Sequence, residues 1–185
     1  ALVTRDGLWE IHGDPTEAAL IVAARKFAGV DLSRDGLTAR FTRLDAIPFE
    51  SDRQFMATLH ASITGAVGGA EGRVVFVKGS VERVLGMCAT ALGQRGDSIP
   101  LDRTEAHSAA AALAARGLRV LAFARADAMP GTSDLTQDMV EGGLAFLGVQ
   151  GMLDPPRPEA INAVAACQRA GVRVKMITGD HALTA

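Results

Sequence analysis

The sequence predicts an α+β domain over residues 1–153 and, after it, the opening of an α/β domain over residues 154–185. In the first part, segments that alternate apolar and polar residues, a pattern typical of strands, are interspersed with segments of helical periodicity. Pro155, Pro156 and Pro158 then interrupt the chain. Beyond them, a helical segment leads into an apolar strand-like run, which is half of a β-α-β unit. The break in composition at the prolines predicts the domain boundary.

The N-terminal part begins with a short strand, expected over Thr4–His12, and continues with a helix. Asp14 is placed to cap that helix, and Pro15 suits its first position. Glu17 then lies near the positive end of the helix dipole. Apolar residues continue at roughly helical spacing until Gly29, which ends the run.

Both strands and helices are expected along the rest of the chain. The expected strands span residues 41–47, 55–63, 73–77, 118–124, 144–153 and 172–177, and the expected helices span residues 81–88, 101–116 and 159–170. A glycine-rich turn over residues 65–72 joins the second and third of these strands into a hairpin. Asp102 caps the longest helix and Gly117 stops it, while Gly171 closes the last helix. The strands that begin at residues 118 and 144 are apolar runs and are expected to be central, and the last strand is expected to be buried.

The composition argues against several classes of function. The net charge is −2 and the isoelectric point is about 6.1, so nothing favours binding to nucleic acid or to an anionic membrane surface. Aromatic residues make up 4% of the chain, which argues against a base-stacking platform for single-stranded nucleic acid. No apolar run is long enough to cross a membrane. Cys88 and Cys167 stand far apart without Cys or His companions, so both are expected to be buried, reduced and free of zinc.

Five short motifs follow one another in a fixed order. They are Gly-Asp-Pro-Thr-Glu at 13–17, Pro-Phe-Glu-Ser-Asp-Arg at 48–53, Val-Lys-Gly-Ser at 77–80, Asp-Pro-Pro-Arg at 154–157 and Met-Ile-Thr-Gly-Asp at 176–180. In this order they resemble the cytosolic nucleotide-binding region of P-type cation-transporting ATPases, closest to the type II, calcium-pump-like branch. The resemblance implies a nucleotide-binding domain over residues 1–153, with an antiparallel sheet flanked by helices. Over residues 154–185 it implies a hinge and a partial phosphorylation domain of the haloacid-dehalogenase-like α/β class.

Lys78 and Gly79 stand at the end of an expected strand. A lysine in this place supplies a point charge for phosphate, and a glycine lets the backbone approach a ligand closely. On spacing alone, a solvated turn lysine is the more common explanation. The resemblance places Lys78 at the mouth of an ATP pocket, with Gly79 as its backbone support. Ser80 and Val81 depart from the family's Lys-Gly-Ala-Pro-Glu segment.

Phe49 follows a proline and precedes a polar turn. An aromatic ring at a strand end can stack on adenine, which contributes roughly 1–3 kcal/mol, although a core aromatic is the common alternative. The resemblance to the family's Pro-Phe-x-Ser-x-Arg-Lys-x-Met segment implies that Phe49 is the stacking residue and that Arg53 belongs to the nucleotide site. Gln54 occupies the place where many members have a lysine near the nucleotide, which removes one positive charge.

Glu17 and Arg119 complete the expected nucleotide site. The carboxylate of Glu17 can accept a hydrogen bond from the exocyclic amine of adenine. The alternative without a ligand is a first-turn glutamate that interacts favourably with the helix dipole. Arg119 lies in a stretch that resembles the family's Gly-x-Arg-Val-Leu-Ala strand, whose arginine reaches the sugar and phosphates. The planar fork of arginine suits phosphate oxygens, and an exposed strand arginine is the alternative.

The last two motifs resemble parts of the neighbouring phosphorylation domain. Asp154 and Arg157 fall in the segment that resembles the interdomain hinge, which helps to place ATP. Thr178, Gly179 and Asp180 resemble the second phosphate-binding motif of haloacid-dehalogenase-like domains, in which a threonine hydroxyl holds the transferred phosphoryl group. A lone Thr-Gly-Asp is otherwise an ordinary strand-to-helix turn.

Two motifs of the family are missing from the chain. The nucleophile motif Asp-Lys-Thr-Gly-Thr and the magnesium motif Gly-Asp-Gly-x-Asn-Asp do not occur. The resemblance therefore implies an excised part of a longer membrane pump. This part binds ATP with Mg²⁺, carries no catalytic residue and no metal-ligand set of its own, and does not turn ATP over alone. In the parent, an ATP-driven cation translocase, it presents the γ-phosphate to the missing aspartate on the cytoplasmic face of the membrane. Its partners there are the phosphorylation, actuator and transmembrane domains.

Other readings of the chain differ in the chemistry that they require. A free-standing phosphatase or kinase needs an Asp-x-Asp nucleophile or a Walker-type loop, and neither occurs. A nucleotide-independent interaction module of the same fold stays open, because Gln54, Ser80 and Val81 depart from the family pattern. The transported ion is not encoded in this stretch. The type II resemblance favours calcium, or sodium, potassium, magnesium or protons, over the heavy metals, whose His-Pro signature is absent.

Overall fold

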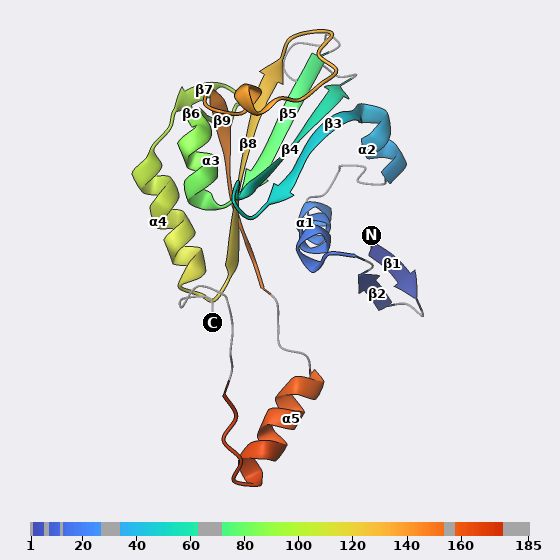
Figure 1. Ribbon diagram of the computed structural model, residues 1–185, viewed down its shortest axis with the longest axis vertical. Coiled ribbons are helices and arrows are strands. Elements are labelled where there is room, and N and C mark those ends of the chain that lie inside the picture. Colours follow the sequence, from blue (N-terminus) through green and yellow to red (C-terminus); the bar gives the residue numbers. More distant parts are fainter. Residues whose placement is uncertain are drawn as a thin grey trace.

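The computed structural model describes residues 2–5, 8–11, 13–26, 34–62, 72–153 and 158–175. Its strands are β1 (Leu2–Arg5), β2 (Leu8–Ile11), β3 (Phe41–Glu50), β4 (Phe55–Ser62), β5 (Gly72–Gly79), β6 (Cys88–Leu92), β7 (Ser98–Pro100), β8 (Arg119–Ala128) and β9 (Leu144–Met152). Its helices are α1 (Pro15–Arg25), α2 (Arg34–Arg40), α3 (Val81–Met87), α4 (Arg103–Ala114), the short 3₁₀ helix Gln137–Met139 and α5 (Pro158–Arg169). Helices thus flank a sheet, and the α+β class predicted from the sequence is confirmed (Figure 1).

Seven strands form the central sheet, in the order β3-β4-β5-β8-β9-β6-β7. The expected hairpin is confirmed, because β4 and β5 pair antiparallel from Phe55–Gly79 to Ser62–Gly72. The apolar strand β8 lies in the middle of the sheet, as its sequence predicts. One pair departs from an antiparallel arrangement, since β6 runs parallel to β9. Parallel neighbours require a long connection, and the chain between these two strands includes α4.

The core lies between one face of the sheet and helices α3 and α4, which Figure 1 shows side by side on that face. Side chains alternate between the two faces of a strand, so every second residue of β4, β5 and β8 enters the core. Leu59, Val77 and Ala124 are examples, and each is almost completely buried. The intervening residues point to the opposite face, which α3 and α4 leave uncovered. That face carries the candidate site.

Local capping signals set the limits of several helices. Asp14 caps α1, because its carboxylate accepts a hydrogen bond of 3.0 Å from the backbone N–H of Glu17. Asp102 caps α4 in the same way through Glu105, and Gly117 follows the end of that helix with a positive φ of 73°. These expectations are confirmed. Gly29 lies outside the described residues.

Other elements differ from the sequence-based expectation. The single strand expected over 4–12 is a hairpin of β1 and β2. The strands β6 and β7 and the helix α2 were not expected at all. The buried strand expected over 172–177 is wrong for its described part, since residues 172–175 have no regular structure and Val172 is 55% exposed. A strand needs a neighbour for its backbone hydrogen bonds, and within the described ranges no strand pairs with this segment.

The expected boundary after residue 153 stays a prediction. Strand β9 ends at Met152 and α5 begins at Pro158, while the hinge residues 154–157 lie outside the described residues. Figure 1 shows α5 apart from the sheet. Among the described helices, none is long and apolar enough to cross a membrane.

Both cysteines are free thiols. Cys88 is buried as expected, and burial raises the pKa of its thiol to about 11, so it is un-ionised at neutral pH. Cys167, on α5, is only partly buried.

The guanidinium of Arg103 closes the C-terminal end of α3. It donates to the backbone carbonyl of Cys88 over 2.7 Å and also to that of Leu85. The last carbonyls of a helix have no partner within the helix, so a cationic donor at this place satisfies them and complements the negative end of the helix dipole. Arg103 therefore links the start of α4 to the end of α3.

We expect Arg103→Ala to lower the free energy of unfolding by roughly 1–3 kcal/mol, because two carbonyls lose a charged donor. Urea unfolding followed by circular dichroism measures this change. Arg116→Ala, at an exposed arginine beyond the end of α4, is the control and should stay within about 0.5 kcal/mol of the parent. Equal effects of the two substitutions would contradict a capping role for Arg103.

Candidate functional site

A pocket of about 570 Å³ opens where the ends of β4, β5 and β8 meet the beginning of α1. Its size falls within the range of roughly 300–1,000 Å³ that is usual for small-molecule sites. The residues that line it are Asp14, Thr16, Glu17, Phe49, Ser51, Gln54, Met56, Lys78, Gly79, Ser80, Arg119, Val120 and Leu121. Carboxylate, amide, hydroxyl, ammonium and guanidinium groups therefore surround one hollow that also has apolar walls.

The strand register brings these residues together from distant parts of the chain. Met56 of β4 is paired with Lys78 of β5, and Lys78 is paired with Phe123 of β8. These three side chains share the face of the sheet that α3 and α4 leave uncovered. One step further along, Gly79 lies between Phe55 and Ala122. From Lys78 toward the end of β5, the register therefore leads along the pocket in the direction of Arg119, the first residue of β8.

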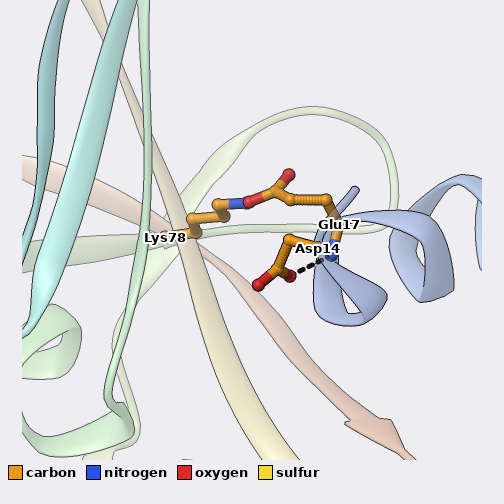
Figure 2. A network of polar contacts seen from close by, with 3 residues as sticks. All are labelled: Asp14, Glu17 and Lys78. Atoms are coloured by element: carbon orange, nitrogen blue, oxygen red, sulfur yellow. Dashed lines mark hydrogen bonds and ion pairs between the residues drawn. The ribbon is translucent and has the colours of Figure 1, made fainter. Parts of the chain in front are cut away.

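The side chains of Lys78 and Glu17 point toward one another and form an ion pair, which Figure 2 shows beside Asp14. The side chain of Lys78 is only 19% exposed, whereas that of Glu17 is 56% exposed. The hydrogen bond from the Glu17 N–H lowers the pKa of Asp14, so this carboxylate stays ionised at the start of α1. The charge of Lys78 is thus matched by a carboxylate inside the pocket, and the pair links α1 to the sheet.

Phe49 is 59% exposed at the end of β3, although it lines the pocket. It is therefore not a core aromatic, which was the alternative left open by its sequence. An exposed ring beside a cavity leaves a π-face available for a planar partner. This exposure makes Phe49 the most direct sign of a ligand with an aromatic ring.

The presence of glycine at position 79 has a structural reason, close backbone packing, that the sequence does not reveal. A Cβ atom at this position would lie 2.3 Å from the carbonyl oxygen of Gln54 and 2.8 Å from Cα of Phe55. The glycine therefore permits the close approach of β5 to the turn before β4. It was expected to make room for a ligand, and in this structure it makes room for the backbone that forms the pocket wall.

Five of the expected nucleotide-site residues line this pocket. They are Glu17, Phe49, Lys78, Gly79 and Arg119. Arg53 is not among the lining residues, and its guanidinium pairs with Glu50 in the same turn, with a distance of 3.1 Å from Nε to Oε2. Its place in a nucleotide site stays a prediction. The expected residues Asp154, Arg157, Thr178, Gly179 and Asp180 lie outside the described residues.

The sequence did not assign a site role to most of the other lining residues. Asp14 was expected only as a helix cap, and Gln54 and Ser80 only as departures from a family pattern. Asp14 and Ser80 lie inside motifs that were identified, and Gln54 directly follows another. A second signal was available for Met56. It lies two residues after Gln54, which ends the turn, and side chains two residues apart along a strand point to the same face.

A smaller hollow of about 280 Å³ adjoins the pocket and shares Glu17, Met56 and Lys78 with it. Arg43, Thr58, Phe76, Val77 and Phe123 form the rest of its lining. The ion pair of Lys78 and Glu17 therefore stands between the two spaces. Over the described part of the chain, no group of three or more His, Cys, Asp or Glu side chains is arranged to hold a metal ion.

Comparison with known proteins places this fold and pocket in context. A family described as "P-type ATPase, cytoplasmic domain N" matches residues 3–159. The chain is 50% identical to the cation-transporting ATPase pma1 of Synechocystis, over 96% of this chain and 18% of that protein. It is 47% identical to the probable cation-transporting ATPase F of Mycobacterium tuberculosis, over 100% of this chain and 19% of that protein. The calcium-transporting ATPase 1 of Bacillus cereus is 36% identical, over 94% of this chain and 18% of that protein. The chain spans less than a fifth of the length of each of these relatives.

We expect Gly79→Ala to lower the free energy of unfolding by roughly 1–3 kcal/mol, because the added methyl group overlaps the backbone of Gln54 and Phe55. Gly86→Ala is the matched control. A Cβ atom at Gly86 meets nothing within 4 Å, and alanine favours the helix α3, so this variant should be as stable as the parent or up to about 1 kcal/mol more stable. Urea unfolding of both variants measures the difference. An unchanged midpoint for Gly79→Ala would contradict the close approach.

Proposed function

The chain belongs to the P-type ATPase cytoplasmic N-domain family, and we propose that its residues 1–153 bind ATP within a longer cation-transporting ATPase. The observation that carries the proposal is the exposed ring of Phe49 beside a pocket that also contains Glu17, Lys78 and Arg119. These residues come from three motifs and one strand that lie far apart in the sequence. Their convergence on one hollow supports a common ligand.

The chemistry of the pocket fits the parts of ATP in order. The adenine ring stacks on Phe49, where both faces of the contact are planar and apolar. The carboxylate of Glu17 accepts a hydrogen bond from the exocyclic amine of adenine, which guanine lacks at the same ring position. Lys78 neutralises Glu17 and keeps its carboxylate in place next to the base. Arg119, which also lines the pocket, offers its guanidinium to the phosphate oxygens.

Within the parent protein, this arrangement implies a division of labour. The domain holds the base and the sugar–phosphate part of ATP and presents the γ-phosphate to an aspartate elsewhere in the chain. Residues 154–158 act as the hinge that lets the domain approach the phosphorylation domain. Mg²⁺ bound to the phosphates would supply charge neutralisation for phosphoryl transfer in the parent protein, and the described residues of this chain contain no His, Cys, Asp or Glu group arranged to hold it. Transport of a cation, the actuator and transmembrane partners, and a place on the cytoplasmic face belong to the parent protein in this proposal.

The alternative is an interaction module that has kept the fold without nucleotide binding. The departures at Gln54, Ser80 and Val81 favour it. The two proposals differ in one observable, which is saturable binding of ATP to the pocket described above.

An amide chemical-shift titration with ATP and with GTP, each with and without Mg²⁺, tests the proposed function. We expect shifts to cluster at Glu17, Phe49, Lys78 and Arg119 and to be stronger with ATP. Phe49→Ala should weaken ATP binding by roughly 5- to 150-fold, which corresponds to a loss of about 1–3 kcal/mol of stacking.

Leu92→Ala provides the control, because Leu92 is an exposed apolar residue on β6, outside the pocket lining. Its affinity for ATP should equal that of the parent. Saturating ATP without a cluster of shifts would reject ATP binding and favour the interaction module. Hydrolysis of ATP by the 185-residue chain at the rate of a pump would reject the division of labour.

A further inference from the structure

Gln54 has an unusual backbone conformation at the edge of the pocket. Its φ is +58°, and among the described residues other than glycine it alone has a positive φ. The left-handed region is uncommon for such a residue and costs free energy, so it persists where the surroundings impose it. The turn before β4 therefore holds Gln54 in place at a conformational cost.

Hydrogen bonds from two sides hold this residue. The N–H of Gln54 donates to the carbonyl of Glu50 over 2.8 Å, and the N–H of Ser80 donates to the carbonyl of Gln54 over 2.9 Å. The missing side chain of Gly79 makes this second contact possible. Both the N–H and the carbonyl of Gln54 are thus fixed to neighbouring segments.

The side chain of Gln54 is also oriented. The hydroxyl of Ser80 donates to its Oε1 atom over 3.3 Å, while Ser80 Oγ accepts the N–H of Arg83 over 3.3 Å as the cap of α3. Because Oε1 is engaged, the two hydrogens on Nε2 remain as donors. Gln54 and Ser80 both line the pocket, and Gln54 is exposed.

The position of this amide points to the sugar–phosphate part of a nucleotide. Ser80 lies two residues beyond Lys78, on the side of the pocket toward Arg119. Lys78 is already paired with Glu17, and the ionised carboxylate of Asp14 lies beside them, so these three groups leave no excess positive charge in this part of the pocket. A fixed amide donor toward Arg119 adds a hydrogen bond to an anionic oxygen without adding a charge.

We propose that Gln54, oriented by Ser80, donates a hydrogen bond from its carboxamide to a phosphate oxygen of the bound nucleotide. The inference rests on the proposed function. Gln54 is the binding residue, and Ser80 is a positioning residue that acts through it. Because the donor is neutral, this contact responds weakly to ionic strength, whereas a cation in the same place would be screened by salt.

Isothermal titration of the 185-residue chain with Mg-ATP, at about 50 mM and at about 300 mM salt, tests the proposal. Gln54→Gly removes the amide but suits the left-handed backbone, so the fold is retained and the thermal midpoint does not fall. We expect this variant to bind ATP roughly 5- to 10-fold more weakly at both salt concentrations. Gln54→Lys should bind ATP at least as tightly as the parent at low salt and lose more affinity than the parent at high salt.

Ser80 is tested by a matched pair of variants. Ser80→Thr keeps the hydroxyl and the helix cap, so it should bind ATP like the parent. Ser80→Gly removes the hydroxyl but is tolerated at a helix N-cap at a cost of only a few tenths of a kcal/mol. Its affinity for ATP should fall toward that of Gln54→Gly, and its salt dependence should stay that of the parent.

The outcomes separate the two proposals. If the parent chain does not bind ATP, the proposed function fails and the role of Gln54 fails with it. If the parent binds ATP and Gln54→Gly binds it equally well, the function stands and the donor role of Gln54 is overturned. If Gln54→Gly is impaired and Ser80→Gly is not, the orienting role of Ser80 is overturned.

Discussion

The register between β4, β5 and β8 is the constraint on which the site depends. Along each of these strands, alternate residues face α3 and α4 or face the pocket. A slip of one residue in β5 would exchange the two sets, so that Lys78 would enter the core and Val77 would face solvent. Burying an unpaired ammonium group is prohibitively costly, and exposing Val75 and Val77, which are almost completely buried, adds a second penalty. The stability of the core and the position of the pocket are therefore two results of one alignment.

The ion pair of Lys78 and Glu17 extends this constraint to α1. The helix starts at a capped Asp14, so its first turn presents Glu17 at a defined height above the sheet. Because Lys78 is mostly buried and Glu17 mostly exposed, the pair lies at the boundary between protein and solvent, where its attraction is only partly screened. It holds α1 near the sheet and sets the polarity of the pocket. Because Glu17 and Phe49 line the same pocket, a strong hydrogen-bond acceptor and an exposed aromatic ring border one space.

The parts of the fold that could be predicted from the sequence are those encoded by near neighbours. Asp14 and Asp102 cap helices through contacts only three residues away, and the alternation in β4 and β5 is visible in a short window. The strands β6 and β7 were missed because they are short. β6 pairs with β9, a segment more than forty residues away along the chain, and β7 pairs with β6. The site followed the same division. Motif resemblance predicted site roles for Phe49 and Lys78, but the exposure of Phe49 and the pairing of Lys78 with Glu17 depend on tertiary packing. Arg53 stays a prediction of the motif: its charge is engaged by Glu50, three residues before it, and it is not among the residues that line the pocket.

The two departures from the family pattern acquire a different meaning once the fold is known. In the sequence, Gln54 and Ser80 stand twenty-six residues apart and count as two separate reasons to doubt nucleotide binding. In the structure they contact each other through both backbone and side chain, at the point where the absence of a Cβ at Gly79 lets β5 approach the turn. An amide at Gln54 needs a hydroxyl to orient it, whereas an ammonium group would need no such partner because its donors radiate in several directions. The hydroxyl of Ser80 thus orients the amide of Gln54. The two departures act together, and in our proposal they supply one hydrogen-bond donor to the pocket. Among the described residues other than glycine, Gln54 alone has a positive φ, so the fold accepts a conformational cost at the place where these two residues meet.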